Sequence, residues 1–244
     1  MSYTVQQSIS FAQTFIQYSP LTAGTGNEPA LSTANEIQNT ILNPPFCWPW
    51  NRKEDSSLTL VAKTQDYTVN ITDFGFLEKV SLTDPDTNNV WEIKDVYNNL
   101  ARGKADANTN KLQRPNACCV LLVTYGTSVK LRFMGVPDKA YGVLLTYQKL
   151  VTPLTALTGA GGTWAIPDQM IDVYNNLFVG ESMAIVDDAR ANIYRARGIG
   201  VLLGKAEGLT ELQINSFLEQ YWQRDHQNQY RTLRTQQGAQ GGAL

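Results

Sequence analysis

The amino-acid sequence predicts an α+β fold in which N- and C-terminal helices form a helical bundle and an antiparallel β-sandwich or barrel domain is inserted between them. Apolar residues repeat at helical spacing at both ends of the chain, whereas residues 58–149 alternate with a period of two and are rich in Val, Leu, Thr and aromatic residues. Because the helices flank the strands in the sequence, we expect the helical ends to pack together and the sheet to project from them.

These changes of period set the expected domain boundaries. Residues 1–50 and 153–235 supply the N- and C-terminal helices of the helical domain, residues 51–152 form the β domain, and residues 236–244 form a flexible tail. The 244-residue chain can hold one large or two small domains, and its 43% hydrophobic content is sufficient for a packed core. The tail is rich in Gln, Gly and Ala, so we expect it to be disordered in isolation.

Two helices are expected at the N-terminus, over residues 2–18 and 28–43. Ser19-Pro20 ends the first, and the second begins at Glu28-Pro29 and ends before a pair of prolines. In each helix, apolar residues three and four positions apart form one face. These residues are Val5, Ile9, Ala12 and Ile16 in the first helix and Leu31, Ala34, Ile37 and Ile41 in the second.

Directly after the second helix, the sequence places Phe46, Trp48 and Trp50 within five positions, between prolines. A turn with this much apolar surface is unfavourable in water, so the aromatic side chains must be covered. They either fill the seam between the helical and β domains or dock on a partner protein. We predict that they form the domain seam.

Seven strands are expected in the β domain. They cover residues 58–61, 67–71, 76–82, 90–96, 118–125, 129–134 and 143–149. Residues 84–89 and the Gly126-Thr127 pair have the composition of hairpin turns, whereas residues 101–114 are expected to form a long loop.

The chain returns to helices after a glycine-rich stretch at 153–162. Pro167 and Asp168 predict the start of a helix, and a further helix is expected from residue 188 to 197, with an extension to 203 that two glycines weaken. The last helix is predicted to begin at Thr210. The residues expected on the buried side of the first of these helices are Ile171, Tyr174, Phe178, Met183 and Ile185.

The sequence contains no convincing catalytic or cofactor-binding motif. His226 is the only histidine, and it lies in a polar stretch of the last helix that builds no pocket for a general base. Residues 198–206 contain three glycines and a lysine, but Ala206 stands where a phosphate loop requires Ser or Thr. We therefore predict that the protein is not an enzyme, with no catalytic residues and no cofactor.

Acidic side chains in two places have alternative explanations. Asp84, Asp86 and Asn88 have the spacing of calcium-loop ligands, but they lie between strands and lack the central glycine, so a hairpin turn is favoured. Asp187 and Asp188 lie between two predicted helices, where Asp commonly caps a helix. We predict no metal site.

Charge and composition exclude several partner classes. A formal net charge of −2 does not favour tight binding to nucleic acid, although a surface of this kind suits a protein that DNA slides past. Three cysteines form no even disulfide framework, which favours reduced thiols in a cytosolic environment. Neither a signal peptide nor an apolar run long enough to span a bilayer is expected, and we predict no membrane association.

The sequence resembles the neck adaptor proteins of tailed bacteriophages, also called head-to-tail connectors or, in short-tailed phages, tail tubular protein A. The likeness lies in the helix pair that ends in residues 43–52, in the β block, and in residues 166–174, which open the helices that contain residues 187–190. It implies a structural virion protein that forms a homo-oligomeric ring of twelve subunits between portal and tail and continues the DNA channel.

The resemblance also implies partners and a location. The partners are the portal protein, a downstream tail or nozzle protein, and genomic DNA that passes through the channel without sequence-specific binding. The protein is expected to assemble in the host cytoplasm and to reside in the virion neck, at the head-tail interface. Because apolar periodicity fades after Trp222, we predict a portal interface in the segment that follows. Its residues are Arg224, Tyr230, Arg231, Leu233 and Arg234.

Two other function classes remain open. Another phage tail-tube or minor virion structural protein would have a dominant sheet and weaker terminal helices. An enzyme on a β scaffold, such as a glycan hydrolase, is disfavoured because the sequence offers no convincing carboxylate pair or nucleophile.

Overall fold

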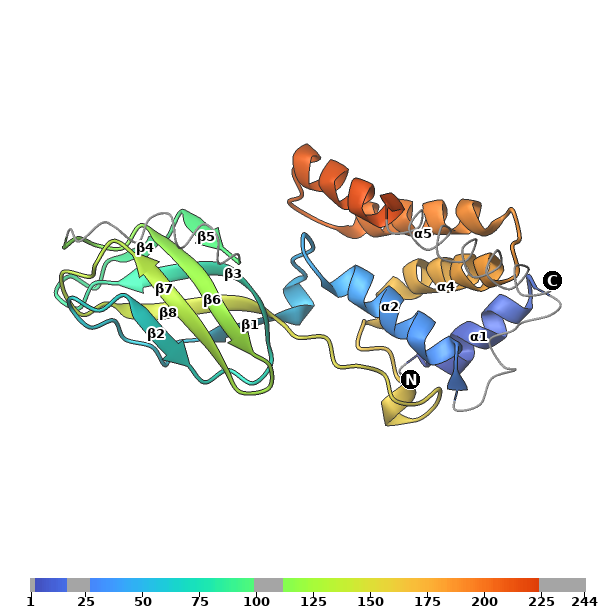
Figure 1. Cartoon of the computed structure of the whole chain (residues 1–244), viewed down its shortest axis with the longest axis horizontal. Helices are drawn as coiled ribbons and strands as arrows, with labels where there is room; N and C mark the ends of the chain where they lie inside the picture. Colours follow the sequence, from blue (N-terminus) through green and yellow to red (C-terminus); the bar gives the residue numbers. More distant parts are fainter. Residues whose placement is uncertain (1–2, 17–26, 99–111, 224–244) are drawn as a thin grey trace, which may run out of the picture.

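The computed structural model describes residues 3–16, 27–98 and 112–223. It confirms a mixed α+β architecture, in which helices gather at one end of the molecule and strands at the other (Figure 1). We use the name helical region for the described residues up to 50 and from 150 onward, and β region for those between 51 and 149. Two chain segments join the regions, one where the chain enters the β region and one where it returns to the helical region.

Both ends of the chain contribute to the core of the helical region. Its main helices are α1 (Val5–Gln13), α2 (Ala30–Leu42), α4 (Ile171–Ile185) and α5 (Ala191–Lys205), and residues 211–223 are also helical. Short 3-10 turns occur at η4 (Ala160–Gly162) and η5 (Asp168–Met170). The α4 helix packs against α1, α2 and α5, and buried residues lie on all of its sides. It is therefore the central element of the helical region.

Specific contacts hold the N-terminus to the C-terminal half. The backbone N–H of Thr4 donates to Gln7 Oε1 at 2.8 Å, which completes a capping box at the start of α1. The Trp164 ring stacks on Tyr174 of α4 with centroids 4.7 Å apart, and its indole N–H donates to Ser8 Oγ of α1 at 3.2 Å. These contacts explain why helices separated by the whole β region share one core.

The α4 and α5 helices approach each other closely at a glycine. A Cβ atom on Gly180 would lie 2.9 Å from the backbone nitrogen of Arg195 and 3.1 Å from the carbonyl oxygen of Ala191. Beside this contact, Arg195 forms a two-pronged ion pair with Glu181, at 2.6 and 3.0 Å.

The β region contains two four-stranded sheets that do not close into a barrel. One sheet has the order β1-β8-β3-β4 and is antiparallel, and the other has the order β2-β7-β6-β5. The strands are β1 (Arg52–Asp55), β2 (Asp66–Val69), β3 (Phe74–Thr83), β4 (Val90–Glu92), β5 (Asp95–Tyr97), β6 (Ala117–Thr124), β7 (Ser128–Met134) and β8 (Gly142–Lys149). Both sheets contribute side chains to a single core, including Val80, Leu82 and Leu145 from the first and Val120, Leu131 and Phe133 from the second.

Three strand predictions were wrong. Residues 58–61 form only an isolated bridge between Thr59 and Gly142, and β1 was not predicted because an exposed, charged edge strand shows no apolar alternation. The predicted strand 90–96 is two strands in different sheets, since buried Ile93 is followed by a crossing to the second sheet. There β5 pairs in parallel with β6, so the sheets are not purely antiparallel.

Other predictions agree with the structure or fall outside it. Hairpins join β3 to β4 and β6 to β7 at the predicted turns, and α5 continues through its glycines to Lys205. Ile185 was predicted to be buried, but 46% of it is exposed because it lies at the last turn of α4, beyond the contact with α5. Most of the predicted loop 101–114 lies outside the described residues.

The glycine contact gives a stability prediction with an internal control. Gly180→Ala places a methyl group against the backbone of α5, so we expect it to destabilise the protein by about 1–3 kcal/mol. Gly200→Ala, in α5 where a Cβ meets nothing within 4 Å, should stabilise it by about 1 kcal/mol. Urea denaturation measures both. Equal effects of the two substitutions would contradict the close approach.

Candidate functional site: the junction between the two regions

The aromatic segment predicted from the sequence lies where the chain leaves the helical region. Phe46 and Trp48 are buried in the helical core, and Trp50 is half-buried and packs against that core. Pro49 begins the short turn η3 (Pro49–Asn51), which leads directly into β1. The indole N–H of Trp48 donates to the carbonyl oxygen of Ile41 at 2.7 Å and so satisfies an acceptor in the last turn of α2.

The aromatic side chains continue into a longer row. Successive ring centroids lie 5.8 Å apart from Trp50 to Trp48 and from Trp48 to Phe46, then 4.9 Å from Phe46 to Phe217 and 6.0 Å from Phe217 to Tyr221. The last two residues belong to the helix of residues 211–223. The row therefore connects that helix to the start of the β region.

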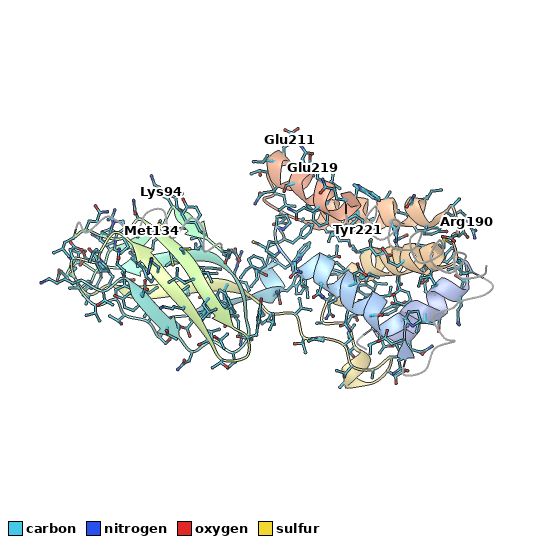
Figure 2. The ribbon with its side chains drawn as sticks, viewed as in Figure 1. Lys94, Met134, Arg190, Glu211, Glu219 and Tyr221 are labelled. Atoms are coloured by element: carbon cyan, nitrogen blue, oxygen red, sulfur yellow. The ribbon has the colours of Figure 1, made fainter. Side chains whose placement is uncertain are left out.

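Only one side of the last helix takes part in this packing. Figure 2 shows Glu211 and Glu219 on the side that points away from the other helices, and both are exposed. Phe217 is the one buried residue in the described part of this helix, whereas Leu212 is 80% exposed. The aromatic row is thus the main attachment of this helix.

A polar network joins the aromatic segment to the β region. The backbone N–H of Trp48 donates to Gln148 Oε1 of β8 at 3.2 Å, and the Gln148 amide donates to Glu78 of β3 at 2.8 Å. Glu78 also accepts a two-pronged ion pair from Arg52 of β1, in which Arg52 Nε lies 3.0 Å from the carboxylate. Gln148 is fully buried. We call these four residues the Gln148 network.

A second set of polar side chains fixes the returning chain to α2. Gln38 donates to the carbonyl oxygen of Thr152 at 2.8 Å and accepts from the N–H of Ala165 at 3.0 Å. Asn35 makes a reciprocal pair with the backbone of Leu154, at 2.7 and 3.1 Å. These side chains supply the hydrogen bonds that an irregular connection cannot make for itself.

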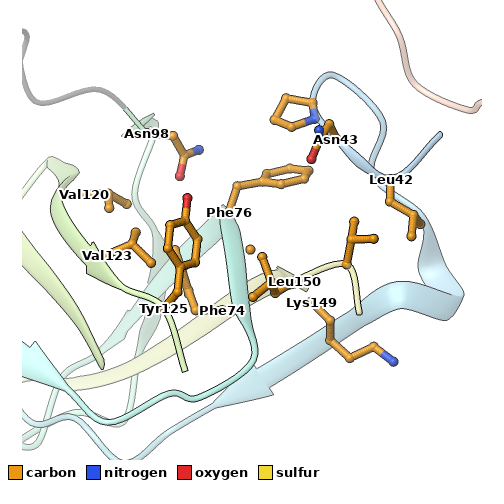
Figure 3. Close-up of a pocket in the computed structure, with 13 residues that line it drawn as sticks. Leu42, Asn43, Phe74, Phe76, Asn98, Val120, Val123, Tyr125, Lys149 and Leu150 are labelled. Carbon is orange, nitrogen blue, oxygen red and sulfur yellow. The ribbon is translucent and has the colours of Figure 1, made fainter. Parts of the chain in front are cut away.

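Clefts lie on two sides of the junction. One, of about 950 Å³, has Trp50, Arg52 and Glu78 on one wall and Met170 and Lys205 on another. The other, of about 310 Å³, is mainly apolar and lies between the end of α2 and the strands β3 and β6 (Figure 3). Its lining includes Leu42, Phe76, Val123, Tyr125 and Leu150.

Two acidic groups at the junction have shifted pKa values. Burial raises the pKa of Glu78, but hydrogen bonds from Arg52 and Gln148 outweigh burial, so its pKa lies below the ordinary value. A carboxylate held ionised in this way is a poor general acid. Burial raises the pKa of Cys47 to about 11, so this thiol is protonated and a weak nucleophile at neutral pH.

The acidic clusters found in the sequence have structural partners. Lys139 Nζ lies 2.7 Å from both Asp84 and Asp86, so an ammonium group occupies the position that a cation would take. Asp188 accepts from the backbone N–H of Arg190 and pairs with its guanidinium group just before α5. Among the described residues, no group of three or more His, Cys, Asp or Glu side chains could hold a metal ion.

Other predicted residues have a clear outcome. Residues 198–206 lie in α5 and at its end rather than in a loop after a strand, which rules out a phosphate loop. The three cysteines are free thiols. In the described part of the chain, no helix is both long and apolar enough to cross a membrane.

His226 and the predicted portal-interface residues lie outside the described residues. The latter are Arg224, Tyr230, Arg231, Leu233 and Arg234.

Sequence reasoning missed the polar residues that organise the junction. Gln148 lies in the strand that contains the apolar run Val143 to Leu145, and Gln38 lies among the apolar positions of α2. A buried amide within an apolar pattern is unfavourable unless it is hydrogen-bonded, so these two positions carried a signal that could have been used.

The aromatic row predicts different effects for its two tryptophans. Trp48→Ala removes a buried ring and the hydrogen bond to Ile41, so we expect it to lower the free energy of unfolding by about 3–5 kcal/mol. Trp50→Ala should cost clearly less, because that ring is half-buried. Thermal and urea denaturation of the isolated protein measure both. Unchanged stability of Trp48→Ala with loss of oligomer assembly would show that the ring faces a neighbouring subunit.

The lowered pKa of Glu78 predicts a pH dependence. A carboxyl group with a depressed folded-state pKa contributes stability above its unfolded pKa, and this contribution is lost as the pH falls through the folded value. We expect Glu78→Gln to lose less stability than the wild type between about pH 5 and pH 2. Denaturation across that range tests this, with Glu54→Gln on the exposed strand β1 as control. Parallel profiles for wild type and Glu78→Gln would refute it.

No protein-family model matches the chain, and a comparison with curated proteins gives no match.

Proposed function

We propose that the protein is a structural component of a tailed-phage virion, a neck adaptor that forms a ring between portal and tail and continues the DNA channel. The observation that carries the proposal is the packing of N- and C-terminal helices in one core, from which a separately packed β region projects. The proposal is supported by the position of the residues that carry the sequence resemblance, since Phe46, Trp48, Ile166 and Tyr174 all lie in this helical core. We interpret the arrangement as a helical bundle with an inserted β-sandwich, divided at the domain boundaries given above.

The junction supports a mechanical role. Aromatic packing and paired hydrogen bonds dominate the junction, where Glu78 is held ionised beside Arg52 and Cys47 is held protonated. A carboxylate with a lowered pKa is a poor acid and a weak base, and a protonated thiol is a weak nucleophile, which favours a structural protein over an enzyme.

A tail-tube or other minor virion protein is the alternative. It fits less well, because the terminal helices are not minor additions to a sheet but form a core of their own around α4. A heterologous ring requires two different contact patches on each subunit, and separate helical and β regions provide surfaces for them.

Assembly with a portal tests the proposal. We expect the protein to remain soluble in isolation and to form a twelve-subunit ring when mixed with the portal protein of its own phage, visible in negative-stain images and by native mass spectrometry. His226→Ala should assemble like the wild type. Failure to bind portal combined with self-assembly into tubes would favour the tail-tube alternative.

The predicted portal-binding segment gives a sharper experiment. Deleting residues 223–244 should leave a folded, soluble subunit that no longer binds portal in a pull-down, and heads assembled with it should leak DNA. Weak contacts repeated twelve times sum to a firm joint only while the segment is present. Replacing Arg224, Arg231 and Arg234 by Gln in the full chain measures the contribution of charge. Normal binding by the deletion variant would contradict this assignment and direct the search for the interface to the β region.

A further inference from the structure

The orientation of the two regions depends on few contacts. The buried residues of the helices and those of the strands form separate cores, and no helix packs extensively against a strand among the described residues. Regions joined without a large apolar interface are expected to move relative to each other unless local contacts hold them.

The connection itself is narrow. The chain crosses from the helical region at residues 48–52 and returns at 149–153. The two crossings are tied together, because the Asn51 amide donates to the carbonyl oxygen of Lys149 at 3.2 Å. Two crossings that are held together in this way allow the β region to bend about one axis at the junction, but they limit its twisting relative to the helical region.

Space is available for such bending on two sides. The larger cleft, of about 950 Å³, separates Arg52 and Glu78 from Lys205 and Met170, and the smaller one, of about 310 Å³, separates Leu42 from β3 and β6. Bending of the β region toward the larger cleft would narrow that cleft, and bending toward the smaller cleft would narrow the smaller one.

We propose that the junction is a hinge, and that the Gln148 network holds the β region in the orientation seen in the structure. The network links backbone on the helical side, at Trp48, to three strands on the other side, through Gln148, Glu78 and Arg52. Each hydrogen bond of this kind makes a small net contribution, and the Arg52 side chain is 40% exposed, which weakens its ion pair. The network therefore sets the preferred orientation but yields to a partner of ordinary affinity.

The aromatic row connects the hinge to the last helix. Trp48, whose N–H binds Gln148, stacks on Phe46, and Phe46 contacts Phe217 of residues 211–223. A shift of the last helix therefore reaches the Gln148 network through two ring contacts. This inference concerns motion within one subunit and does not depend on the proposed virion role.

Distance measurements in the full chain test the hinge. Spin labels carried by p-acetylphenylalanine at the exposed positions Thr68 in β2 and Asn192 in α5 leave the three cysteines untouched. Double electron-electron resonance should give one narrow distance distribution for the otherwise wild-type protein. Gln148→Ala and Arg52→Ala should each make the distribution at least twice as wide, with unchanged helix and strand content by circular dichroism.

Lys53→Ala is the matched control. Lys53 follows Arg52 on β1 and forms an exposed ion pair with Asp73 at 2.8 Å that does not involve Trp48, so its removal should leave the distribution narrow. The proposal is wrong if Arg52→Ala, which changes a partly exposed side chain and should fold normally, gives the wild-type distribution. It is also wrong if the wild type is already as broad as the variants, or if Lys53→Ala broadens the distribution equally.

Discussion

The arrangement of the molecule depends on two interactions of Trp48. Its ring is buried in the helical core, and its backbone N–H donates a hydrogen bond to Gln148 of the β region. The ring is held in the helical core by Phe46 and by the carbonyl oxygen of Ile41, while the backbone N–H of the same residue is held by a strand of the β region. One residue thus belongs to both parts. The chain leaves the helical region at this position because the prolines around it end α2 and begin a turn.

The return of the chain is fixed by amide side chains rather than by apolar packing. Gln38 and Asn35 of α2 satisfy the backbone of residues 152–154, so the second crossing runs alongside the helix that preceded the first. Consequently a large β insertion does not separate the helices that flank it. The α4 helix, which follows the return, can then pack on α1 and α2 as if the chain were continuous.

Much of this architecture could be predicted from the sequence, for a physical reason. Amphipathic helices and apolar strands carry their structure in local patterns, and α2, α4, β3 and β8 appear close to where those patterns place them. The helix predicted over residues 2–18 is shorter in the structure, where α1 covers Val5–Gln13. The edge strand β1 carries charged residues, and the 90–96 segment divides between sheets because of what it meets in space. The position of Gln148 in a predicted strand was visible, but its partners Trp48 and Glu78 are distant in sequence, and no local pattern identifies them.

The energetics of the two regions and of their joint differ in scale. Within each region, truncation of one core aromatic residue costs several kcal/mol, so neither region opens easily. Across the joint, the structure offers the hydrogen bond from the Trp48 backbone to Gln148, which Glu78 and the partly exposed Arg52 support from within the β region, and each of these contacts contributes on the order of 1 kcal/mol. A partner that grips both regions can therefore reorient one against the other at a cost well below that of unfolding either. In the proposed neck-adaptor role, this difference would allow a tight fit to two partners while each contact surface stays rigid.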